Sequence, residues 1–380
     1  MITNKSQLMF LACVDLSKNY SGIARKVLTE YNTLNKYIPS ILIGYYKNGI
    51  VIYNGNKSIV IEKVKKHRRI ELINCAKKYS ENGIKYVYIR RFPCNPLVIN
   101  FLACIKRQGC EKIVWEIPTY PYDHEHDAYK LDIYTVIVDT LDKIYRKKLK
   151  KYVNRIVTFS NRKNLFGIET INTGNGIDVE SIRPRKIKSI SDQIDMIAVA
   201  VLNNWHGYDR LIQGIYEYYQ KGGLRKVFFH LVGDGHCLNQ YKEQAKKLDV
   251  TPNVIFYGFK NKDEIDEIYD LCDVAVDSLG WHRSKVEIGT SIKTREYLAK
   301  GLPIIASTPM DIFPDGWDYA YYAPTDDTPI DIEKVIEFID ELRIKNSAKE
   351  LADEIRKICK EKCDMSVTMK PIIEYLLSGR

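Results

Sequence analysis

The stretch Gly289-Thr-Ser-Ile-Lys-Thr-Arg-Glu-Tyr-Leu-Ala-Lys-Gly-Leu-Pro-Ile-Ile305 indicates a loop, a helix with a polar face, and a buried strand. Lys293, Glu296 and Lys300 are spaced i, i+3 and i+7, so a helix places them on one face. Gly301 suits the position just after a helix end, and Pro303 stops the helix from continuing. The segment therefore predicts one loop–helix–strand unit of an α/β domain.

The first turn of this helix carries Lys293, Arg295 and Glu296. Free N–H groups and the positive dipole end of a helix suit a diphosphate, and a carboxylate one turn in accepts hydrogen bonds from sugar hydroxyls. The alternative is a surface Lys–Glu pair at i, i+3, which contributes only ~0.2–0.5 kcal/mol. The rest of the chain favours the ligand-binding interpretation.

Composition limits the class of protein. A chain of 380 residues with 45% hydrophobic and 28% charged residues is expected to form roughly two soluble domains. No apolar run reaches the length of about 18 residues that a membrane-spanning helix needs. The N-terminal apolar run is interrupted at Asp15, which favours a first buried strand over a signal peptide. Nine scattered cysteines without a Cys-x-x-Cys motif indicate reduced thiols in a cytoplasmic protein.

The positive charge is concentrated in the first half of the chain. Residues 1–180 hold 30 Lys and Arg against 16 Asp and Glu, whereas the remainder holds 28 against 32. This asymmetry suggests that the first half meets an anionic partner, either a membrane surface or nucleic acid. The 27 tyrosines are spread over the whole chain and no nucleic-acid-binding signature is present, which argues against nucleic acid.

Strand-like apolar runs alternate with helical stretches, which predicts parallel sheets in α/β domains. The predicted strands are 8–13, 41–46, 86–89, 112–116, 155–160 and 168–173 in the first half, and 195–201, 226–232, 254–257, 274–278, 303–306 and 319–322 in the second. The polar connector after Asn175-Gly-Ile-Asp178 is the best boundary. We expect domains at 1–182 and 183–365, and a last helix at 366–380 that packs on either one.

Loops after these strands carry glycine and polar residues, and ligands of such sheets lie beyond the carboxyl ends of the strands. Each loop alone is weak evidence, because any strand-to-helix turn uses glycine. Together they predict a shared polyanion site. The loops contain Gly22, Glu116–Asp123, Trp205–Arg210, Gly233–Gly235, Gly258–Lys260 and Gly280–Arg283.

The second half resembles the nucleotide-sugar-binding domain of retaining glycosyltransferases of the group 1, or family 4, type. The matching elements, in order, are Ser160, Asn175-Gly-Ile-Asp178, Trp205-His-Gly207, Leu231-Val-Gly-Asp-Gly235, Val254-Ile-Phe-Tyr-Gly258 and Lys293-Thr-Arg-Glu-Tyr-Leu-Ala-Lys-Gly-Leu-Pro303. The resemblance implies the GT-B fold, an α/β architecture in which two Rossmann-like domains face a central cleft. The segments Glu116–Asp123 and Leu279–Arg283 resemble a bacterial subgroup that assembles surface polysaccharide.

The resemblance also implies roles for individual residues. Catalytic roles are expected for Glu116, His206, Arg210 and Lys293. Donor binding is expected for Gly22, Gly233, Gly235, Gly258, Phe259, Arg283, Thr290, Ser291, Ile292, Arg295 and Glu296. Acceptor binding is expected for Thr119, Tyr120, Tyr122 and Asp123, with Arg90 and Arg91 nearby. No cofactor is implied and metal is not expected to be required, because cationic side chains stabilise the leaving diphosphate.

The sequence departs from the family pattern at three places. Of the two glutamates that the family spaces E-x7-E, the second is Glu296, but Ile288 occupies the first position beside Glu287. Val201 and His206 stand where the family commonly has an arginine and a lysine. The family's frequent histidine after an N-domain strand is replaced in the region of Glu116–Thr119.

Two further segments allow two interpretations each. Asp123-His-Glu-His-Asp127 resembles a metal chelate but lacks a third histidine, so a polar lip of the cleft is favoured. The segment Asp142–Arg155 is a basic helix candidate in which Ile144, Leu149 and Val153 interleave with lysines. It forms either a solvated face or a docking surface for anionic lipid, and Lys63–Arg69 extends the same basic patch.

The sequence thus predicts a retaining glycosyltransferase of the hexosyltransferase type, cytoplasmic and peripheral on the inner membrane face. The donor is a nucleotide diphosphate sugar, with a UDP-sugar favoured, and the acceptor is a growing polysaccharide or lipid-linked glycan precursor. A sugar-nucleotide epimerase or a phosphorylase on the same fold is the nearest alternative enzyme. An alternative from another class is a catalytically silent sugar-nucleotide-binding or scaffold protein of a polysaccharide assembly complex.

Overall fold

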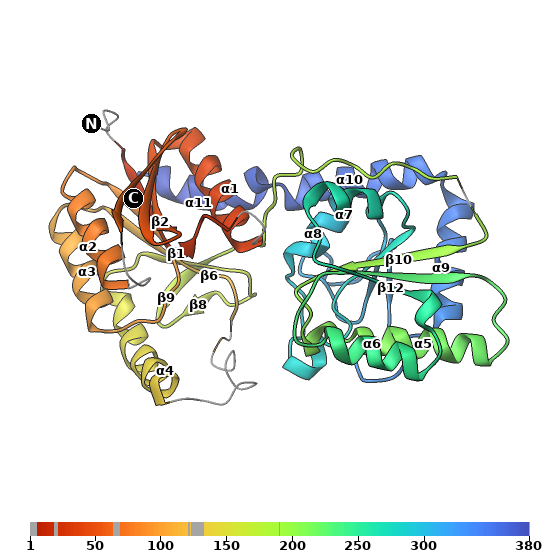
Figure 1. The fold of residues 1–380 in the computed structure, drawn as a ribbon. Coiled ribbons are helices and arrows are strands. Elements are labelled where there is room, and N and C mark those ends of the chain that lie inside the picture. Colours follow the sequence, from red (N-terminus) through yellow and green to blue (C-terminus); the bar gives the residue numbers. More distant parts are fainter. Residues whose placement is uncertain are drawn as a thin grey trace. The chain divides into compact units, whose positions relative to one another are not determined.

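The computed structural model describes residues 6–18, 22–63, 69–120, 122, 133–189 and 191–379. The chain divides into two compact units, one formed by residues 1–176 with 365–380 and the other by residues 177–364. The division falls six residues before the boundary expected from the polar connector. Each unit is an α/β domain with helices on both faces of its sheet (Figure 1).

In the described part of the first unit, nine strands form one sheet in the order β4-β3-β2-β1-β5-β6-β7-β9-β8. Its strands are β1 (Leu8–Asp15), β2 (Ser40–Tyr46), β3 (Gly49–Asn54), β4 (Lys57–Lys63), β5 (Tyr86–Arg90), β6 (Lys112–Ile117), β7 (Arg155–Thr158), β8 (Asn164–Leu165) and β9 (Ile168–Asn172). Its helices are α1 (Gly22–Tyr37), α2 (Arg69–Ser80), α3 (Pro96–Arg107), α4 (Ile133–Tyr145) and α11 (Met365–Leu377), with the 3₁₀ helix η1 (Arg146–Lys151).

The central strand β1 explains why this sheet is covered on both faces. Met9 and Leu11 pack into a core with α2 and α3, while Leu8, Phe10 and Ala12 pack into a second core with α1 and α11. The sequence of a central strand in a parallel sheet is a continuous run of apolar residues, because both faces of the strand are buried. The last helix, α11, therefore completes the first unit although it comes from the other end of the chain.

In the described part of the second unit, six parallel strands are ordered β12-β11-β10-β13-β14-β15. The strands are β10 (Ile194–Val199), β11 (Val227–Val232), β12 (Val254–Gly258), β13 (Val274–Val276), β14 (Ile304–Ala306) and β15 (Ala320–Tyr322). The helices are α5 (Tyr208–Gln220), α6 (Leu238–Lys247), α7 (Lys262–Tyr269), α8 (Ile292–Ala299), α9 (Ile332–Lys345) and α10 (Ala348–Cys363), and the 3₁₀ helices are η2 (Asn204–His206), η3 (Thr251–Asn253) and η4 (Trp281–Ser284). Helices α5, α6 and α9 contribute to one core, and α7, α8 and α10 contribute to the other.

The strands and the last helix expected from the sequence are confirmed with shifts of a few residues at their ends. The antiparallel pair β3–β4 was missed, although Asn48-Gly49 and Asn54-Gly55 are typical hairpin signals. The expected basic helix over Asp142–Arg155 is wrong in its bounds, because α4 ends at Tyr145 and a 3₁₀ helix follows. No helix in the described residues has the length and apolarity needed to cross a membrane.

Gly214 on α5 tests how tightly this helix packs. A Cβ built on Gly214 lies 2.0 Å from the carbonyl oxygen of Ile330. Gly214→Ala is expected to lower the free energy of unfolding by about 1–3 kcal/mol, because overpacking outweighs the gain of about 1 kcal/mol in helix propensity. Urea unfolding followed by circular dichroism measures this, with Gln213→Ala as the control. A Gly214→Ala protein as stable as the unmodified chain would contradict the close packing.

Candidate functional site

The strand order of the second unit reverses between β10 and β13. Strands β10, β11 and β12 follow one another outward on one side, and β13, β14 and β15 do so on the other. Loops that leave β10 and β13 at their carboxyl ends therefore lead to opposite halves of the sheet. Ligands of open α/β sheets bind at such a switch point.

The two loops at the switch point are joined to each other by backbone hydrogen bonds. The N–H of Leu279 donates to the carbonyl oxygen of His206 at 2.7 Å, and that of Gly280 donates to Trp205 at 3.2 Å. Gly207 has φ 61°, and a Cβ built on it lies 2.5 Å from the nitrogen of Gly280. A side chain at Gly207 would push these two loops apart, so glycine permits their contact.

Helix α8 begins beside these loops. Ser291 is its N-cap and accepts a hydrogen bond from the N–H of Thr294. In the first turn, Lys293 donates from Nζ to the hydroxyl of Tyr208 at 3.0 Å and lies 3.5 Å from Oδ1 of Asp277. The Ser291 hydroxyl donates to the same Asp277 oxygen at 3.1 Å. One buried carboxylate after β13 thus fixes the start of α8.

Burial at this point lowers the pKa values of both His206 and Lys293. Burial lowers the pKa of Lys293 to about 8, although the carboxylate of Asp277 opposes this shift. Burial, and then the charge of Lys293, lowers the pKa of His206 to about 2. His206 Nδ1 accepts from the N–H of Asn203 at 3.0 Å, so the ring caps η2 as a neutral imidazole. This geometry weighs against His206 as a cationic replacement for the family's lysine.

Several buried polar side-chain atoms at or beyond the ends of β13, β14 and β15 have no hydrogen-bond partner among the described residues. They are the Trp281 indole Nε1, the Ser278 and Thr308 hydroxyls and the Tyr322 hydroxyl. A Cβ built on Gly289 would lie 3.4 Å from Trp281 Nε1 and 3.8 Å from Asp277 Oδ2, so the indole and carboxylate flank the same glycine. Burial and then Asp277 raise the pKa of Tyr322 to about 12, which keeps its hydroxyl protonated. Buried polar groups are usually satisfied, so the unsatisfied ones at these strand ends are consistent with a ligand, water or ion bound there.

Two of the predicted arginines, Arg210 and Arg295, are buried and held by groups of the protein. Arg210 donates to the backbone carbonyls of Thr328, Pro324 and Leu279. The Arg295 guanidinium donates to both oxygens of Asp311 and is fully buried. These contacts weigh against direct diphosphate contact by either residue and give both a structural role.

Arg283 is less enclosed than the other two. It makes a bidentate pair with Asp209 at 2.9 and 2.7 Å and a further ion pair with Asp327 at 2.7 Å. These carboxylates raise its pKa above the ordinary value. Two aspartates already balance this guanidinium, so its positive charge is largely compensated within the protein.

The other predicted donor residues of this unit lie on the same edge of the sheet. Gly235 and Leu202 form an isolated parallel β-bridge, and the N–H of Gly233 donates to the carbonyl of Gly258 at 2.8 Å. Phe259 follows with a side chain that is 68% exposed. Thr290, Ile292 and Glu296 are half-buried at the start and middle of α8. The loops after β10, β11, β12 and β13 therefore form one hydrogen-bonded rim.

Glu116 lies in the first unit, at the end of β6, and is completely buried. Its carboxylate accepts from Lys26 Nζ at 2.9 Å and from Arg90 Nη1 at 3.0 and 3.1 Å. Burial raises its pKa, but Arg90 and Lys26 outweigh burial and hold the pKa below its usual range. The neighbouring Glu30, buried beside it, has a raised pKa from burial and from the charge of Glu116. This enclosure weighs against Glu116 as a group that reaches a substrate.

The predicted acceptor residues differ in exposure. Thr119 is exposed and Tyr120 half-buried, whereas the buried Tyr122 donates its hydroxyl to Asp142 at 3.0 Å. The guanidinium of Arg91 stacks 3.3 Å from the Tyr122 ring centroid. Gly22 begins α1 in this same unit. Asp123 and the whole His-x-His motif at 123–127 lie outside the described residues.

Metal binding is not indicated by the part of the chain that the structure describes. Those residues contain no group of three or more His, Cys, Asp and Glu side chains arranged to hold a metal ion.

The sequence interpretation missed Asp277, Ser278 and Tyr322, and it gave no individual role to Tyr208 and Trp281 within the predicted loops. Asp277 and Ser278 were assigned to the end of a strand, but β13 stops at Val276. The available signal was the polar pair that follows Val-Ala-Val, because an aspartate directly after a buried strand lies at the ligand edge of a parallel sheet.

The fold is that of a two-domain α/β protein, and the rim of polar loops marks a candidate ligand site at the switch point of its second sheet. Residues 180–316 match the family model for "Glycosyl transferases group 1". A search of curated proteins found no match to the chain.

Solved structures match nearly the whole chain at low sequence identity. A glycosyltransferase from Rickettsia africae has a TM-score of 0.65 at 13% identity, covering 98% of this chain and 100% of that one. Sucrose-phosphate synthase from Thermosynechococcus elongatus has a TM-score of 0.66 at 12% identity, with coverage of 98% and 100%. Anabaena Alr3699/HepE in complex with UDP has a TM-score of 0.61 at 14% identity, with coverage of 97% and 99%. These similarities show that the chain has the GT-B fold, and its residues 180–316 are the part that resembles group 1 glycosyl transferases.

The structural role of Arg295 gives a prediction. Asp311→Asn and Arg295→Met are each expected to lower the free energy of unfolding by about 3–5 kcal/mol, because each leaves one buried group without its charged partner. The double variant is expected to lose less than the sum of the two. Urea unfolding measures all three, with Asp315→Asn at an exposed site as the control. Additive losses would contradict a direct Arg295–Asp311 interaction.

Proposed function

We propose that this protein transfers a sugar, with retention of configuration, from a nucleotide diphosphate sugar to a growing polysaccharide or lipid-linked glycan precursor. A UDP-sugar is the favoured donor. The observation that carries the proposal is the position of Lys293. It stands in the first turn of α8 at the switch point, on the same edge of the sheet as buried polar atoms that lack partners among the described residues.

The chemistry of this position suits a leaving diphosphate. Negative charge develops on the phosphate oxygens as the glycosidic bond breaks, and a cation aimed at that charge lowers the barrier. Lys293 supplies such a cation near neutral pH, and the N–H groups at the start of α8 add to it. Glu296, one turn further along, is proposed to accept from the ribose hydroxyls. The departing phosphate oxygen deprotonates the acceptor hydroxyl, so the proposal needs no protein nucleophile.

Two similar structures support the choice of donor and acceptor class. Anabaena Alr3699/HepE has been solved with UDP-glucose, at a TM-score of 0.60 to this chain. WaaB, with a TM-score of 0.57, is a lipopolysaccharide outer core galactosyltransferase. On this basis we propose a UDP-sugar donor and an acceptor that is a growing polysaccharide or a lipid-linked glycan. A cytoplasmic location, peripheral to the inner membrane face, is proposed because such acceptors are assembled there.

The alternative is a catalytically silent sugar-nucleotide-binding or scaffold protein. It is favoured by Ile288, which replaces the family's first glutamate, and by Val201, which is 74% exposed where the family has an arginine. Turnover of a UDP-sugar by the purified chain separates the two functions. Nucleotide binding without any hydrolysis or transfer supports the alternative.

Nucleotide binding tests the proposed site directly. A thermal-shift screen against UDP, GDP, ADP, dTDP and CMP without added metal should show stabilisation by one of them, about 2.7 kcal/mol at a concentration of 100 Kd. Glu296→Ala should abolish the shift at that concentration, because the ribose hydroxyls lose their acceptor. Glu267→Ala, an exposed glutamate on α7, is the matched control and should keep the shift. No shift with any nucleotide would refute the site as assigned.

The lowered pKa of Lys293 predicts a pH dependence. Only the protonated amine attracts a diphosphate, so the affinity for UDP should be constant below pH 8 and fall by up to tenfold per pH unit above it. Uridine, which lacks phosphates, and the Lys293→Met variant should both show a flat profile. Isothermal titration calorimetry between pH 6.5 and 9.5 measures these affinities.

The stability of the ligand-free protein should change in the opposite direction. The folded pKa of Lys293 is about 8 and its ordinary value is 10.5, so the unfolded chain binds more protons between these two values. The contribution of Lys293 to stability therefore rises with pH across that window, and loss of UDP affinity there is not unfolding at this site. A UDP affinity that stays constant to pH 9.5 would contradict the role of Lys293.

A further inference from the structure

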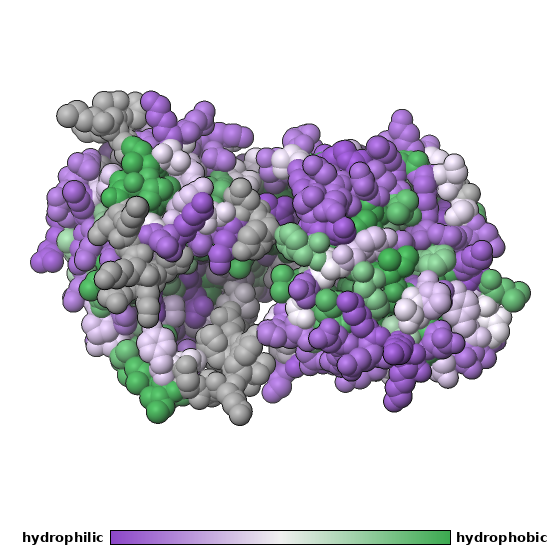
Figure 2. Space-filling view, viewed as in Figure 1, coloured by the Kyte–Doolittle hydropathy of each residue, from purple (hydrophilic) through white to green (hydrophobic). Residues whose placement is uncertain are grey.

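Helix α4 of the first unit presents its apolar side to the exterior. Ile133, Val136, Ile137 and Ile144 are spaced i, i+3, i+4 and i+11, so they lie on one face of the helix. Their side chains are 81%, 47%, 52% and 52% exposed. Figure 2 shows a hydrophobic patch on the first unit where Figure 1 places α4.

The side of α4 that faces the domain is held by a carboxylate. Asp142 is the buried residue of the helix, and it accepts from the N–H of Cys94 at 2.6 Å and from the Tyr122 hydroxyl at 3.0 Å. Arg146, one turn later, lies 3.7 Å from the same carboxylate and 4.9 Å from the Phe166 ring centroid. The helix is thus inverted relative to the usual amphipathic helix, which buries its apolar stripe.

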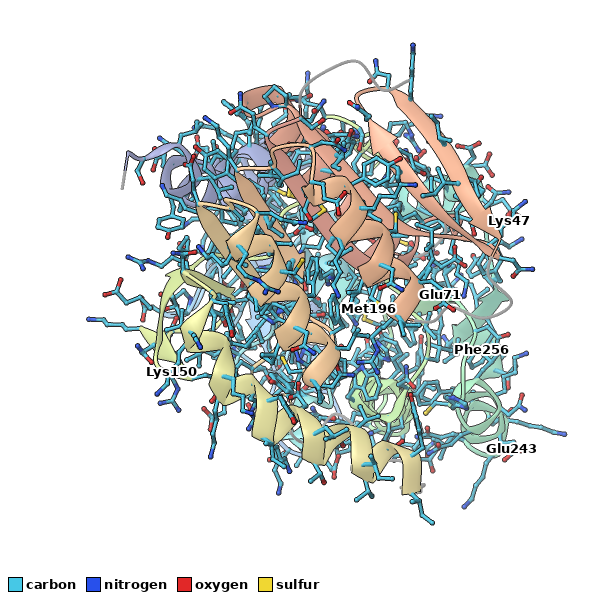
Figure 3. All side chains as sticks on the ribbon, turned by 90° about the vertical axis from the view of Figure 1, so that its left-hand side faces the viewer. Lys47, Glu71, Lys150, Met196, Glu243 and Phe256 are labelled. Carbon is cyan, nitrogen blue, oxygen red and sulfur yellow. The ribbon has the colours of Figure 1, made fainter. Side chains whose placement is uncertain are left out.

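Positive charge continues from this apolar stripe along the chain. Lys143 on α4 and Lys147, Lys148, Lys150 and Lys151 on η1 are exposed. Leu149, buried among them, fixes η1 on the domain. Figure 3 shows the side chains of α4 and η1 extending outward along one border of the first unit, with Lys150 labelled. The aspartates of this segment, Asp139 and Asp142, are half-buried and buried.

We propose that the face formed by α4 and η1 docks on an anionic lipid surface. The four isoleucine and valine side chains would enter the boundary between headgroups and acyl chains, and the lysines would face lipid phosphates. A second copy of the chain fits this face less well, because an isologous contact would bring the η1 lysines of both copies together. The inference deepens the proposed function and rests on the peripheral location proposed there. It assigns that location to a surface of the first unit that does not depend on the second unit's site.

Vesicle flotation of the full chain tests the proposal. In 0.15 M salt, the protein should bind vesicles of phosphatidylcholine with 30% phosphatidylglycerol at least tenfold more tightly than vesicles of phosphatidylcholine alone. The double variant Ile137→Glu/Ile144→Glu should lose at least tenfold of this affinity. Lys147→Gln/Lys150→Gln should weaken binding to the anionic vesicles and reduce its salt dependence.

Matched controls lie on the second unit. Ile344→Glu changes an isoleucine on α9 that is 84% exposed, and Lys246→Gln/Lys247→Gln changes two exposed lysines on α6. Both should bind vesicles like the unmodified chain. All variants should keep the same thermal unfolding and the same response to UDP, which separates failure of docking from failure of the donor site.

Three outcomes would overturn the proposal. They are equal binding to neutral and anionic vesicles, binding that the α4 and η1 variants leave unchanged, and a dimer in solution that the Ile137→Glu/Ile144→Glu protein does not form. The last would assign the face to a second copy of the chain. Light scattering coupled to gel filtration measures the dimer.

Discussion

The site of the second unit depends on parallel pairing between two strands that are not consecutive in the chain. Met196 and Ile197 of β10 pair with Val274 and Ala275 of β13, and β11 and β12 lie outside that pair. This pairing brings His206 beside Leu279 and places Asp277 where α8 begins. The contacts of Lys293 with Tyr208 and Asp277 follow from that single pairing.

Around Lys293 the protein compensates most of its positive charge internally. Arg283 is balanced by Asp209 and Asp327, Arg295 by Asp311, and Lys300 by Asp266. Lys293 differs because its carboxylate neighbour, Asp277, is 3.5 Å away and shared with Ser291, while burial lowers its pKa. An incoming diphosphate would interact with this lysine more strongly than with an arginine already paired. The sequence places many basic residues near this site, but most of them are paired with carboxylates. Few therefore have a positive charge that is free to attract a ligand.

Local features of the fold were predictable from the sequence, and long-range pairs were not. Gly301 and Pro303 correctly indicated the end of α8, because a left-handed glycine and a following proline act within one turn. The Arg295–Asp311 pair joins a helix to a loop beyond the next strand, and no local pattern predicts it. The sequence analysis expected a helix only from Asp142 onward and so did not identify most of α4. Which face of α4 turns inward depends on the contacts of Asp142 with Cys94 and Tyr122, which lie well before it in the chain.

The first unit shows why a carboxylate at the end of a strand does not by itself define a catalytic group. Glu116 has the position expected of one, at the carboxyl end of β6, but Lys26 and Arg90 reach its oxygens from α1 and β5. Glu30 adds a second carboxylate to the same buried group, and Lys26 pairs with it at 2.9 Å. The charges of the two glutamates are therefore balanced by those of Lys26 and Arg90. The two cations stabilise the carboxylate of Glu116 more than that of Glu30, so the pKa of Glu116 is lowered and the pKa of Glu30 is raised. Breaking a buried network of this kind leaves an uncompensated charge, so its first consequence is for stability rather than for chemistry.

The group ties α1, β5 and β6 together at the switch point between β1 and β5, and this rigid base supports the loops on which an acceptor site would be built.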